Sequence, residues 1–251
     1  MGQIGLQLWS IREEVEQDLL GMLEKVAAIG YSAVQFAGFF NHPAEEVKAK
    51  MDEVSIQAAG AHVQITDLEH HLDETLKYHE TIGNSYLIVP YLPESMRTTA
   101  EDYQRTAALL NDIGKQLHAK GFSLGYHNHD FEFAQFDGKT GFDILFENTD
   151  ANHLKMELDC FWAAYTDNNP VDIIGKYAER CVSLHIKDMK VEGDQHISTE
   201  LGTGALPLAD YVQHGKKHNV RWFVVEQEHF TKDPVESAAQ NATAISIIFD
   251  K

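Results

Sequence analysis

Four side chains of types that bind divalent metals recur along the sequence at intervals suited to a barrel of repeating units. They are Glu132, Asp159, His185 and Glu226, and each lies at or just beyond the end of a short apolar run. The intervals are 27, 26 and 41 residues, and one strand with its return helix takes about 25 to 30 residues. The spacing predicts that the four side chains meet at the carboxyl ends of successive parallel strands. Three carboxylates and an imidazole suit one ion of manganese, magnesium, cobalt or zinc, with open positions for a substrate.

Apolar runs of strand length alternate with stretches of helical periodicity from one end of the chain to the other. The eight runs are residues 4–8, 33–37, 56–63, 86–89, 122–126, 154–158, 182–186 and 222–225. Continuously apolar strands separated by helices are typical of a parallel sheet covered on its outer side. Eight such units predict an α/β fold, a (β/α)8 TIM barrel forming a single domain over residues 1–251. A doubly wound sheet is the alternative, but no Gly-x-Gly-x-x-Gly turn follows the first run.

Composition and charge indicate the kind of partner and the location. Of 251 residues, 43% are hydrophobic and 24% charged, which is ordinary for a soluble enzyme. The net charge of −19 opposes binding to nucleic acid or to an anionic membrane. Without an apolar run of about 18 residues or a basic leader, the sequence favours a cytoplasmic protein. Cys160 and Cys181 are expected to be reduced thiols, because they would lie at opposite ends of neighbouring parallel strands.

The segment after the fifth apolar run holds the densest group of polar side chains. Residues 126–133 read YHNHDFEF and include His127, His129 and Glu132. So many metal-competent groups are unfavourable in a core and natural in a site. Histidines in a loop also serve as hydrogen-bonding caps, which is the alternative for each of them alone.

Three further strand ends carry charged residues among apolar neighbours. Asp159 needs a metal or an arginine if it is buried, because an unpaired buried charge is costly; alternatively it caps the next helix. Trp162 offers an aromatic face to a sugar ring. Lys187 suits polarisation of a substrate oxygen, and Glu226, after three apolar residues, is the best candidate for a carboxylate that faces the barrel axis.

Two positions extend this end of the expected barrel. His62 follows four small residues that leave room near the axis, and it either hydrogen bonds a substrate hydroxyl or is a structural histidine. The longest expected loop covers residues 189–207 and contains Gly202-Thr203-Gly204. This turn lacks the lysine and the strand-helix setting of a nucleotide-binding loop. We therefore expect a mobile lid here.

Taken together, these segments resemble the xylose isomerase-like barrel superfamily, in the branch of sugar phosphate isomerases/epimerases. The matching stretches are residues 5–12, 36–38, 126–133, 158–159, 161–162, 185–188, 202–204 and 225–227. The resemblance implies a (β/α)8 barrel with one divalent metal held by Glu132, Asp159, His185 and Glu226. His127 and His129 are rivals of Glu132 for the first ligand position. The expected substrate-binding residues are Trp9, His127, His129 and Trp162.

The resemblance also implies chemistry at a sugar carbonyl. In such enzymes the metal bridges a carbonyl and an adjacent hydroxyl and stabilises the enediolate formed when a carboxylate removes the proton between them. Glu226 and Glu132 are the expected acid-base pair, with His62 and Lys187 as further catalytic residues. Epimerisation, aldose-ketose isomerisation and dehydration of a keto-inositol or keto-sugar are all compatible with these residue types. Gln35 stands where the family often has Glu, and an amide cannot carry the proton.

The class of sugar and two other functions remain open at this stage. Near the expected rim the cations are Arg12, Lys187 and Lys190, so a neutral keto-sugar or 3-keto-glycoside is as compatible as a sugar phosphate. Abasic-site endonucleases of the same superfamily use three zinc ions and need a cationic surface, which the net charge opposes. A non-catalytic sugar-binding barrel has no need of four metal ligands. The expected partner is a small carbohydrate, and a homo-oligomer is possible.

Overall fold

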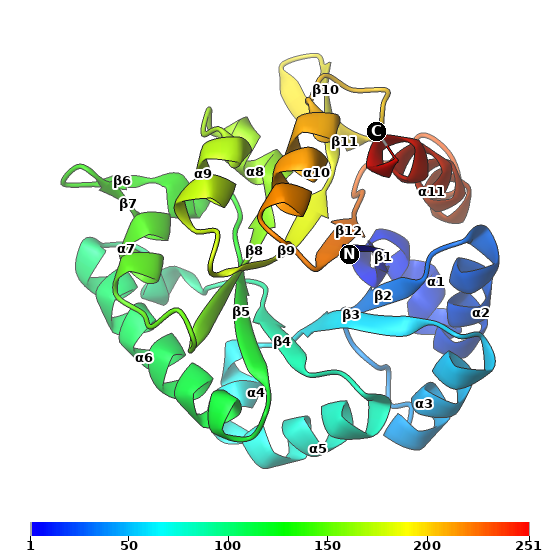
Figure 1. The fold of residues 1–251 in the computed structure, drawn as a ribbon, viewed down its shortest axis with the longest axis horizontal. Helices are drawn as coiled ribbons and strands as arrows, with labels where there is room; N and C mark the ends of the chain where they lie inside the picture. Colours follow the sequence, from blue (N-terminus) through cyan, green and yellow to red (C-terminus); the bar gives the residue numbers. More distant parts are fainter. Residues whose placement is uncertain (1, 251) are drawn as a thin grey trace.

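A computed structural model describes residues 2–250 and shows eight parallel strands that close into a barrel (Figure 1). Each strand pairs with the next along the chain, and the last pairs with the first. The predicted (β/α)8 barrel and all eight predicted strand runs are confirmed. The strands are β1 (Gln3–Gln7), β2 (Ala33–Phe36), β3 (Gln57–His62), β4 (Tyr86–Val89), β5 (Ser123–His127), β8 (Leu154–Asp159), β9 (Cys181–Ile186) and β12 (Trp222–Val225).

Helices form the outer ring of the barrel in Figure 1. Their apolar faces pack on the outside of the sheet, as in α2, where Met22, Leu23 and Val26 are buried. The helices are α1 (Arg12–Gln17), α2 (Leu19–Ile29), α3 (Ala44–Glu53), α4 (Ile65–His70), α5 (Leu72–Ile82), α6 (Ala100–Ala119), α7 (Gly141–Glu147), α8 (Cys160–Tyr165), α9 (Pro170–Lys176), α10 (Leu208–Lys217) and α11 (Pro234–Phe249).

Local end signals explain where several helices begin and end. Gly30 closes α2 in the left-handed conformation that glycine adopts at little cost. Thr99 and Asp102 form a capping box at the start of α6. Asp67 lies in the first turn of α4, where a carboxylate interacts favourably with the helix dipole.

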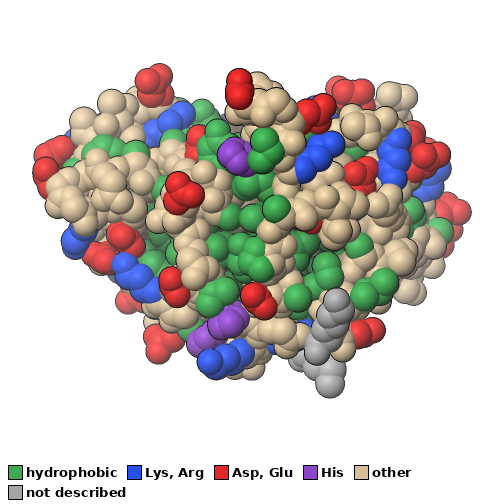
Figure 2. Space-filling view, turned by 90° about the horizontal axis from the view of Figure 1, so that it is seen from above, with side chains coloured by type: hydrophobic (Ala, Val, Ile, Leu, Met, Phe, Trp, Pro, Cys, Tyr) green, Lys and Arg blue, Asp and Glu red, His purple; other side chains and the backbone are tan. Residues whose placement is uncertain are grey.

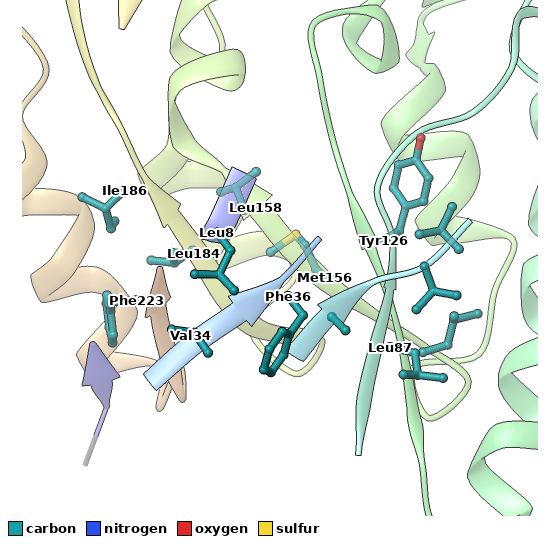
Figure 3. Packing of buried hydrophobic residues seen from close by; sticks show 14 of the residues in the cluster. Leu8, Val34, Phe36, Leu87, Tyr126, Met156, Leu158, Leu184, Ile186 and Phe223 are labelled. Carbon is teal, nitrogen blue, oxygen red and sulfur yellow. The ribbon is translucent and has the colours of Figure 1, made fainter. Parts of the chain in front are cut away.

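The two faces of each strand carry different residues. The outer face belongs to a large apolar cluster that includes Val34, Phe36, Leu184 and Phe223 (Figure 3). A second, small cluster joins Ala33, Ala59, Trp222 and Val224. Because alternate residues of a strand face opposite sides of the sheet, this small cluster lies inside the barrel. It forms an apolar floor beneath the polar residues at the strand ends.

The segment expected to be a loop at residues 189–207 is partly a β-hairpin. Strands β10 (Asp188–Glu192) and β11 (Gln195–Thr199) pair in antiparallel fashion over five residue pairs. The Asp188 carboxylate then accepts hydrogen bonds from the backbone N–H groups of Gly202, Gly204 and Leu206. The expectation of a loop is therefore wrong for residues 189–199, which form the hairpin, whereas residues 200–207 are a turn held by Asp188; the mobile lid stays a prediction. A shorter hairpin joins β6 (Gln135–Phe136) and β7 (Lys139–Thr140).

Two other expectations concern the cysteines and the membrane. Cys160 and Cys181 are both free and buried, as expected. Within residues 2–250 the structure shows no helix that is both long enough and apolar enough to span a bilayer.

A close contact between α6 and the chain entering β8 gives a test of the packing. A Cβ atom added at Gly114 would lie 1.9 Å from the carbonyl oxygen of His153. We expect Gly114→Ala to lower the free energy of unfolding by about 1 to 3 kcal/mol, the usual cost of overpacking, in urea denaturation. Gly175→Ala on α9 is the matched control, because an added Cβ meets nothing within 4 Å there, and alanine is the better helix former. Equal midpoints for the two variants would contradict this close approach.

Candidate active site

The carboxyl ends of five strands bring polar side chains together inside one end of the barrel. His62, His127 and Asp159 are the last residues of β3, β5 and β8. His185 lies near the end of β9, directly opposite Asp159 in the sheet register. Glu226 follows β12. This is the end of the barrel at which the sequence spacing placed the site.

Four of these side chains form a buried cluster, called here the outer cluster: His127, Asp159, His185 and Glu226. Each offers one ligand atom, and these atoms lie within 4.8 Å of one another. Asp159 Oδ2 is buried without a hydrogen-bond partner, 3.9 Å from His127 Nε2 and 4.0 Å from His185 Nδ1. The Lys187 ammonium lies 3.2 Å from this oxygen but makes no hydrogen bond to it, and a buried oxygen without a hydrogen bond is unfavourable. Two imidazoles and two carboxylates are a donor set that suits a divalent transition metal, so these residues fit one ion.

Glu132, expected from the sequence as the first ligand, lies outside the outer cluster. Its carboxylate accepts hydrogen bonds from the Tyr126 hydroxyl and, at 2.8 Å, from the His129 backbone N–H. Burial raises the pKa of Glu132 to about 8 although these two bonds lower it. The reason is the chain path: β5 ends at His127, and Glu132 lies beyond it on a short 3-10 turn. We therefore propose His127, the rival considered from the sequence, as the first ligand.

Asp159 caps the next helix, and its other carboxylate oxygen is available for the proposed metal site. Its Oδ1 accepts the backbone N–H groups of Phe161 and Trp162 at 2.8 and 3.0 Å and so caps α8. Its Oδ2 faces the outer cluster. The cap fixes the carboxylate, so that the second oxygen is held in one position without help from a side chain.

A residue that the sequence analysis missed, Glu157, lies at the centre of a second group. Its Oε1 lies 2.8 Å from His62 Nε2, 3.2 Å from His127 Nδ1 and 3.1 Å from His185 Nε2. Burial alone would raise the pKa of Glu157, but His185 and the hydrogen bonds from the histidines lower it well below 4.5. A signal was present in the sequence, because residues two apart on a strand share a face and Glu157 stands two positions before Asp159.

Gln35 extends this second group, called here the inner network. Its Nε2 donates to Glu157 Oε2 at 2.5 Å, and its Oε1 accepts from Gln7 Nε2 at 2.6 Å. The same Oε1 lies 2.7 Å from His185 Nε2. A glutamate at position 35 would place a second anion beside Glu157. The amide joins the network without adding charge.

Positive charge in the outer cluster comes from Lys187 and His185. Lys187 Nζ is buried 2.9 Å from Glu226 Oε2, 3.2 Å from Asp159 Oδ2 and 3.4 Å from Glu228 Oε1. Burial lowers the pKa of Lys187, but Asp159 and Glu226 outweigh it and the net shift is upward. Burial likewise opposes the charge on His185, yet the Glu157 and Glu226 carboxylates raise its pKa to about 10. A metal ion at the outer cluster would compete with this proton.

A cavity of about 240 Å³ opens from the outer cluster to the surface. Of the expected substrate-binding residues, Trp9, His127 and His129 line it, whereas Trp162 lies beside His129 with ring centroids 5.8 Å apart and does not reach the wall. None of the lysines and arginines within residues 2–250 lines it. The complete lining is Trp9, Ala37, His62, Gln64, Pro90, Tyr91, His127, His129, Glu226 and Glu228.

A wider groove of about 540 Å³ adjoins this cavity and shares Ala37, His62 and Gln64 with it. Phe39 and Tyr78 form an aromatic wall, with ring centroids 4.3 Å apart. The remaining lining residues are Gly38, Val63, Asp67, His71, Glu74, Thr75 and His79. The groove also lacks lysine and arginine.

Comparison with known proteins gives a consistent family and fold. The pattern of the xylose isomerase-like TIM barrel matches residues 23–246. The inosose dehydratase of Geobacillus kaustophilus (strain HTA426) is 24% identical over 191 residues, which are 67% of this chain and 61% of that protein. This chain therefore aligns with less than two thirds of that relative's length.

Two solved structures share the fold over almost their whole length. The sugar phosphate isomerase/epimerase from Parabacteroides distasonis ATCC 8503 has a TM-score of 0.83 at 22% identity, over 96% of this chain and 97% of that one. The IOLI protein, solved with a binding zinc atom, has a TM-score of 0.77 at 12% identity, over 99% and 98%. At these identities the two likenesses support the fold alone.

The choice between His127 and Glu132 is tested by metal affinity. We expect His127→Gln to weaken Mn²⁺ binding by at least about tenfold in calorimetric titration. Losing a residue that only hydrogen bonds to a metal ligand already lowers metal affinity by about that factor, and losing the ligand itself should lower it at least as much. Glu132→Gln should bind Mn²⁺ nearly as the unmodified protein does, since its carboxylate hydrogen bonds to Tyr126 and His129 rather than to the outer cluster. The reverse order of affinities would restore Glu132 as the first ligand.

Proposed function

The chain belongs to the xylose isomerase-like TIM barrel family, and from that premise we propose that it is a divalent-metal-dependent isomerase or epimerase of an uncharged keto-sugar. The observation that carries the proposal is the outer cluster, in which Asp159 Oδ2 is buried without a hydrogen-bond partner. Glu226 belongs both to this cluster and to the wall of a cavity large enough for a sugar ring. A protein that only binds sugar would not need one carboxylate that both belongs to a metal site and faces the substrate cavity.

The distribution of cations favours an uncharged sugar over a sugar phosphate. A phosphate group is usually bound by arginine, lysine or the start of a helix. The three cations expected near the rim each contact another side chain. Lys187 is buried among carboxylates, and Lys190 lies 3.4 Å from Glu192. Arg12 lies over the Trp9 ring, 5.0 Å from its centroid. In the part of the chain that the structure describes, neither the cavity nor the groove has a lysine or arginine in its lining.

The adjoining groove favours a substrate longer than one ring. It is continuous with the cavity through Ala37, His62 and Gln64. The aromatic wall of Phe39 and Tyr78 suits the face of a second ring, and exposed polar side chains such as Glu74 can accept its hydroxyl hydrogen bonds. We therefore include keto-glycosides, with the keto ring in the cavity and the second ring in the groove, in the proposed substrate class.

The proposed chemistry begins with removal of a proton next to the carbonyl. His127, Asp159, His185 and Glu226 would hold the metal ion, which when bound stabilises negative charge on the sugar oxygens. Burial would raise the pKa of Glu226, but Lys187 and His185 lower it well below its usual range, so it is ionised at neutral pH. His62 faces the same cavity from β3 and can hold a hydroxyl, and Trp9 can cover the ring.

Glu228 is the second titratable carboxyl in the cavity wall, and its pKa is shifted in the opposite direction to that of Glu226. Burial raises the pKa of Glu228, Lys187 opposes this, and the Glu226 and Asp159 carboxylates add to the rise. Two carboxyl groups with pKa values moved in opposite directions are the pattern of an acid and a base. We propose that Glu228, rather than the displaced Glu132, returns the proton.

Dehydration is the second candidate function. Its specific support is that Glu226 and Glu228 both follow β12 and reach the cavity from the same wall. A base and an acid on one side suit removal of a proton and departure of a hydroxyl from the same face of a sugar ring. Inosose dehydratases are among the relatives, over part of their length.

Proton exchange tests the chemistry and the role of Glu226. Protein loaded with Mn²⁺ and incubated in D₂O with keto-sugars should exchange the proton beside the carbonyl, as followed by NMR, and a chelator should stop it. Glu226→Gln should keep the fold and lower the exchange rate by at least about a hundredfold, the scale of lost acid-base catalysis. Near-normal exchange would remove Glu226 from this role. Glu236→Gln, an exposed carboxylate on α11, is the control, and the product spectrum separates isomer from dehydrated sugar.

The groove is tested by comparing two substrates in one variant. Glu74→Ala should raise KM for a keto-glycoside by about fivefold, the effect of losing a hydrogen bond of roughly 1 kcal/mol. Its KM for the free keto-sugar should not change, because the free sugar fills only the cavity. Glu69→Ala, on the neighbouring helix but outside the groove lining, is the control. An equal rise for both substrates would show that the groove does not hold the second ring.

A further inference from the structure

We propose that Glu157 is a positioning residue, which fixes opposite proton arrangements on the two histidines of the outer cluster. The inference rests on the proposed metal dependence and extends it to a residue that is not itself one of the four proposed ligands. Glu157 is fully buried on β8, one layer deeper than Asp159. Its Oε1 is within hydrogen-bonding distance of three histidine rings.

The ring of His127 lies between the inner network and the outer cluster. Its Nδ1 is 3.2 Å from Glu157 Oε1, and its Nε2 is 3.9 Å from Asp159 Oδ2. A neutral imidazole has one N–H group and one nitrogen lone pair. The hydrogen bond to a carboxylate requires the proton on Nδ1, so the lone pair on Nε2 faces the outer cluster.

The ring of His185 is turned the other way. Its Nε2 is 2.7 Å from Gln35 Oε1 and 3.1 Å from Glu157 Oε1. Its Nδ1 is 3.1 Å from Glu226 Oε2. Two oxygen acceptors on the inner side place a proton on Nε2, and the nitrogen left for a metal is Nδ1. One carboxylate oxygen thus selects different ligand atoms on the two rings.

The hydrogen bonds made by Glu157 and Asp159 favour the outer cluster over the inner network as the site of the ion. His62, His127, Glu157 and His185 also lie close enough to surround one. However, Glu157 already has three histidine nitrogens at Oε1 and the Gln35 amide at Oε2. A carboxylate with that many donors needs no cation, whereas Asp159 Oδ2 makes no hydrogen bond and has only the Lys187 ammonium, 3.2 Å away, beside it. A neutral imidazole has one nitrogen lone pair. If the inner nitrogens of His127 and His185 carry the protons that bond to Glu157 and Gln35, both lone pairs face the outer cluster.

Nitrogen NMR of the zinc-loaded protein tests the proton arrangement directly. With ¹⁵N-labelled histidine, long-range proton-nitrogen correlations distinguish the two neutral tautomers. We expect His127 to be protonated at Nδ1 and His185 at Nε2. The same tautomer at both residues, or the opposite assignment, would overturn the inference without any mutation of the barrel interior.

Two substitutions separate positioning from charge. We expect Glu157→Gln to weaken Zn²⁺ binding by about ten- to a hundredfold, the usual effect of removing a supporting partner of a metal ligand, in competition with a chromophoric chelator. Glu157→Asp keeps the charge but withdraws the oxygens from the rings, and it should weaken binding as well. Affinity like that of the unmodified protein in Glu157→Asp would show that charge alone acts, and the inference would fail.

Ser183→Ala is the matched control. Ser183 pairs with Glu157 across β8 and β9, is equally buried, and its hydroxyl has no hydrogen-bond partner. Zinc affinity should therefore stay unchanged in this variant.

The outcomes separate this inference from the proposed function. If the Glu157 variants lose zinc affinity but no keto-sugar exchanges its proton, the inference stands and the proposed function fails. If exchange occurs but both Glu157 variants bind zinc as the unmodified protein does, the function stands and the inference fails. A protein that binds no divalent ion would overturn both.

Discussion

The structure at the open end of the barrel depends on the cost of burying three carboxylates close together. Glu157, Asp159 and Glu226 all lie in the interior, out of contact with bulk water. Burying each ion costs several kcal/mol unless an opposite charge or hydrogen bonds compensate for the lost hydration. Lys187 and His185 supply positive charge, and the remaining histidines and Gln35 supply hydrogen bonds. Asp159 Oδ2 lies 3.2 Å from the Lys187 ammonium but makes no hydrogen bond within residues 2–250, and we propose that a divalent ion binds beside it.

The buried charged side chains lie directly above an apolar layer because alternate residues of each strand face the barrel interior. Trp222 and Val224 on β12 belong to the apolar floor, and Glu226 continues the same face one step further along. Water is excluded from below, so electrostatic interactions above the floor are stronger than at a surface. The same geometry brings the proposed ligand atoms from β5, β8 and β9, and from Glu226 just after β12, within 4.8 Å of one another. The fold and the site are therefore set by one repeating feature, the register of parallel strands.

The same feature explains which parts of the site were predictable from the sequence. Apolar runs identify buried parallel strands, so the eight strands and the proposed ligands Asp159 and His185 near their ends could be found. Spacing does not show where a strand stops, and β5 stops at His127, which displaced Glu132 from its expected place. Glu157 was missed because it lies inside an apolar run rather than at its end. Glu157 contacts histidine rings from three other strands. Contacts between residues so far apart in the sequence cannot be predicted from a local sequence pattern.

The two candidate reactions differ in where the second proton-transfer group must be. Inversion at a carbon requires proton donors on opposite faces of the sugar, whereas removal of water or movement of a proton to the next carbon can use one face. Glu226 and Glu228 come from one strand end, and His62 on β3 faces the cavity across the barrel. His62 Nε2 lies 2.8 Å from Glu157 Oε1, so this ring is tied to the inner network. The two carboxyl groups of the cavity lining are therefore on one wall, and within the proposed isomerase or epimerase function we infer that this asymmetry suits isomerisation, or the alternative dehydration, better than epimerisation.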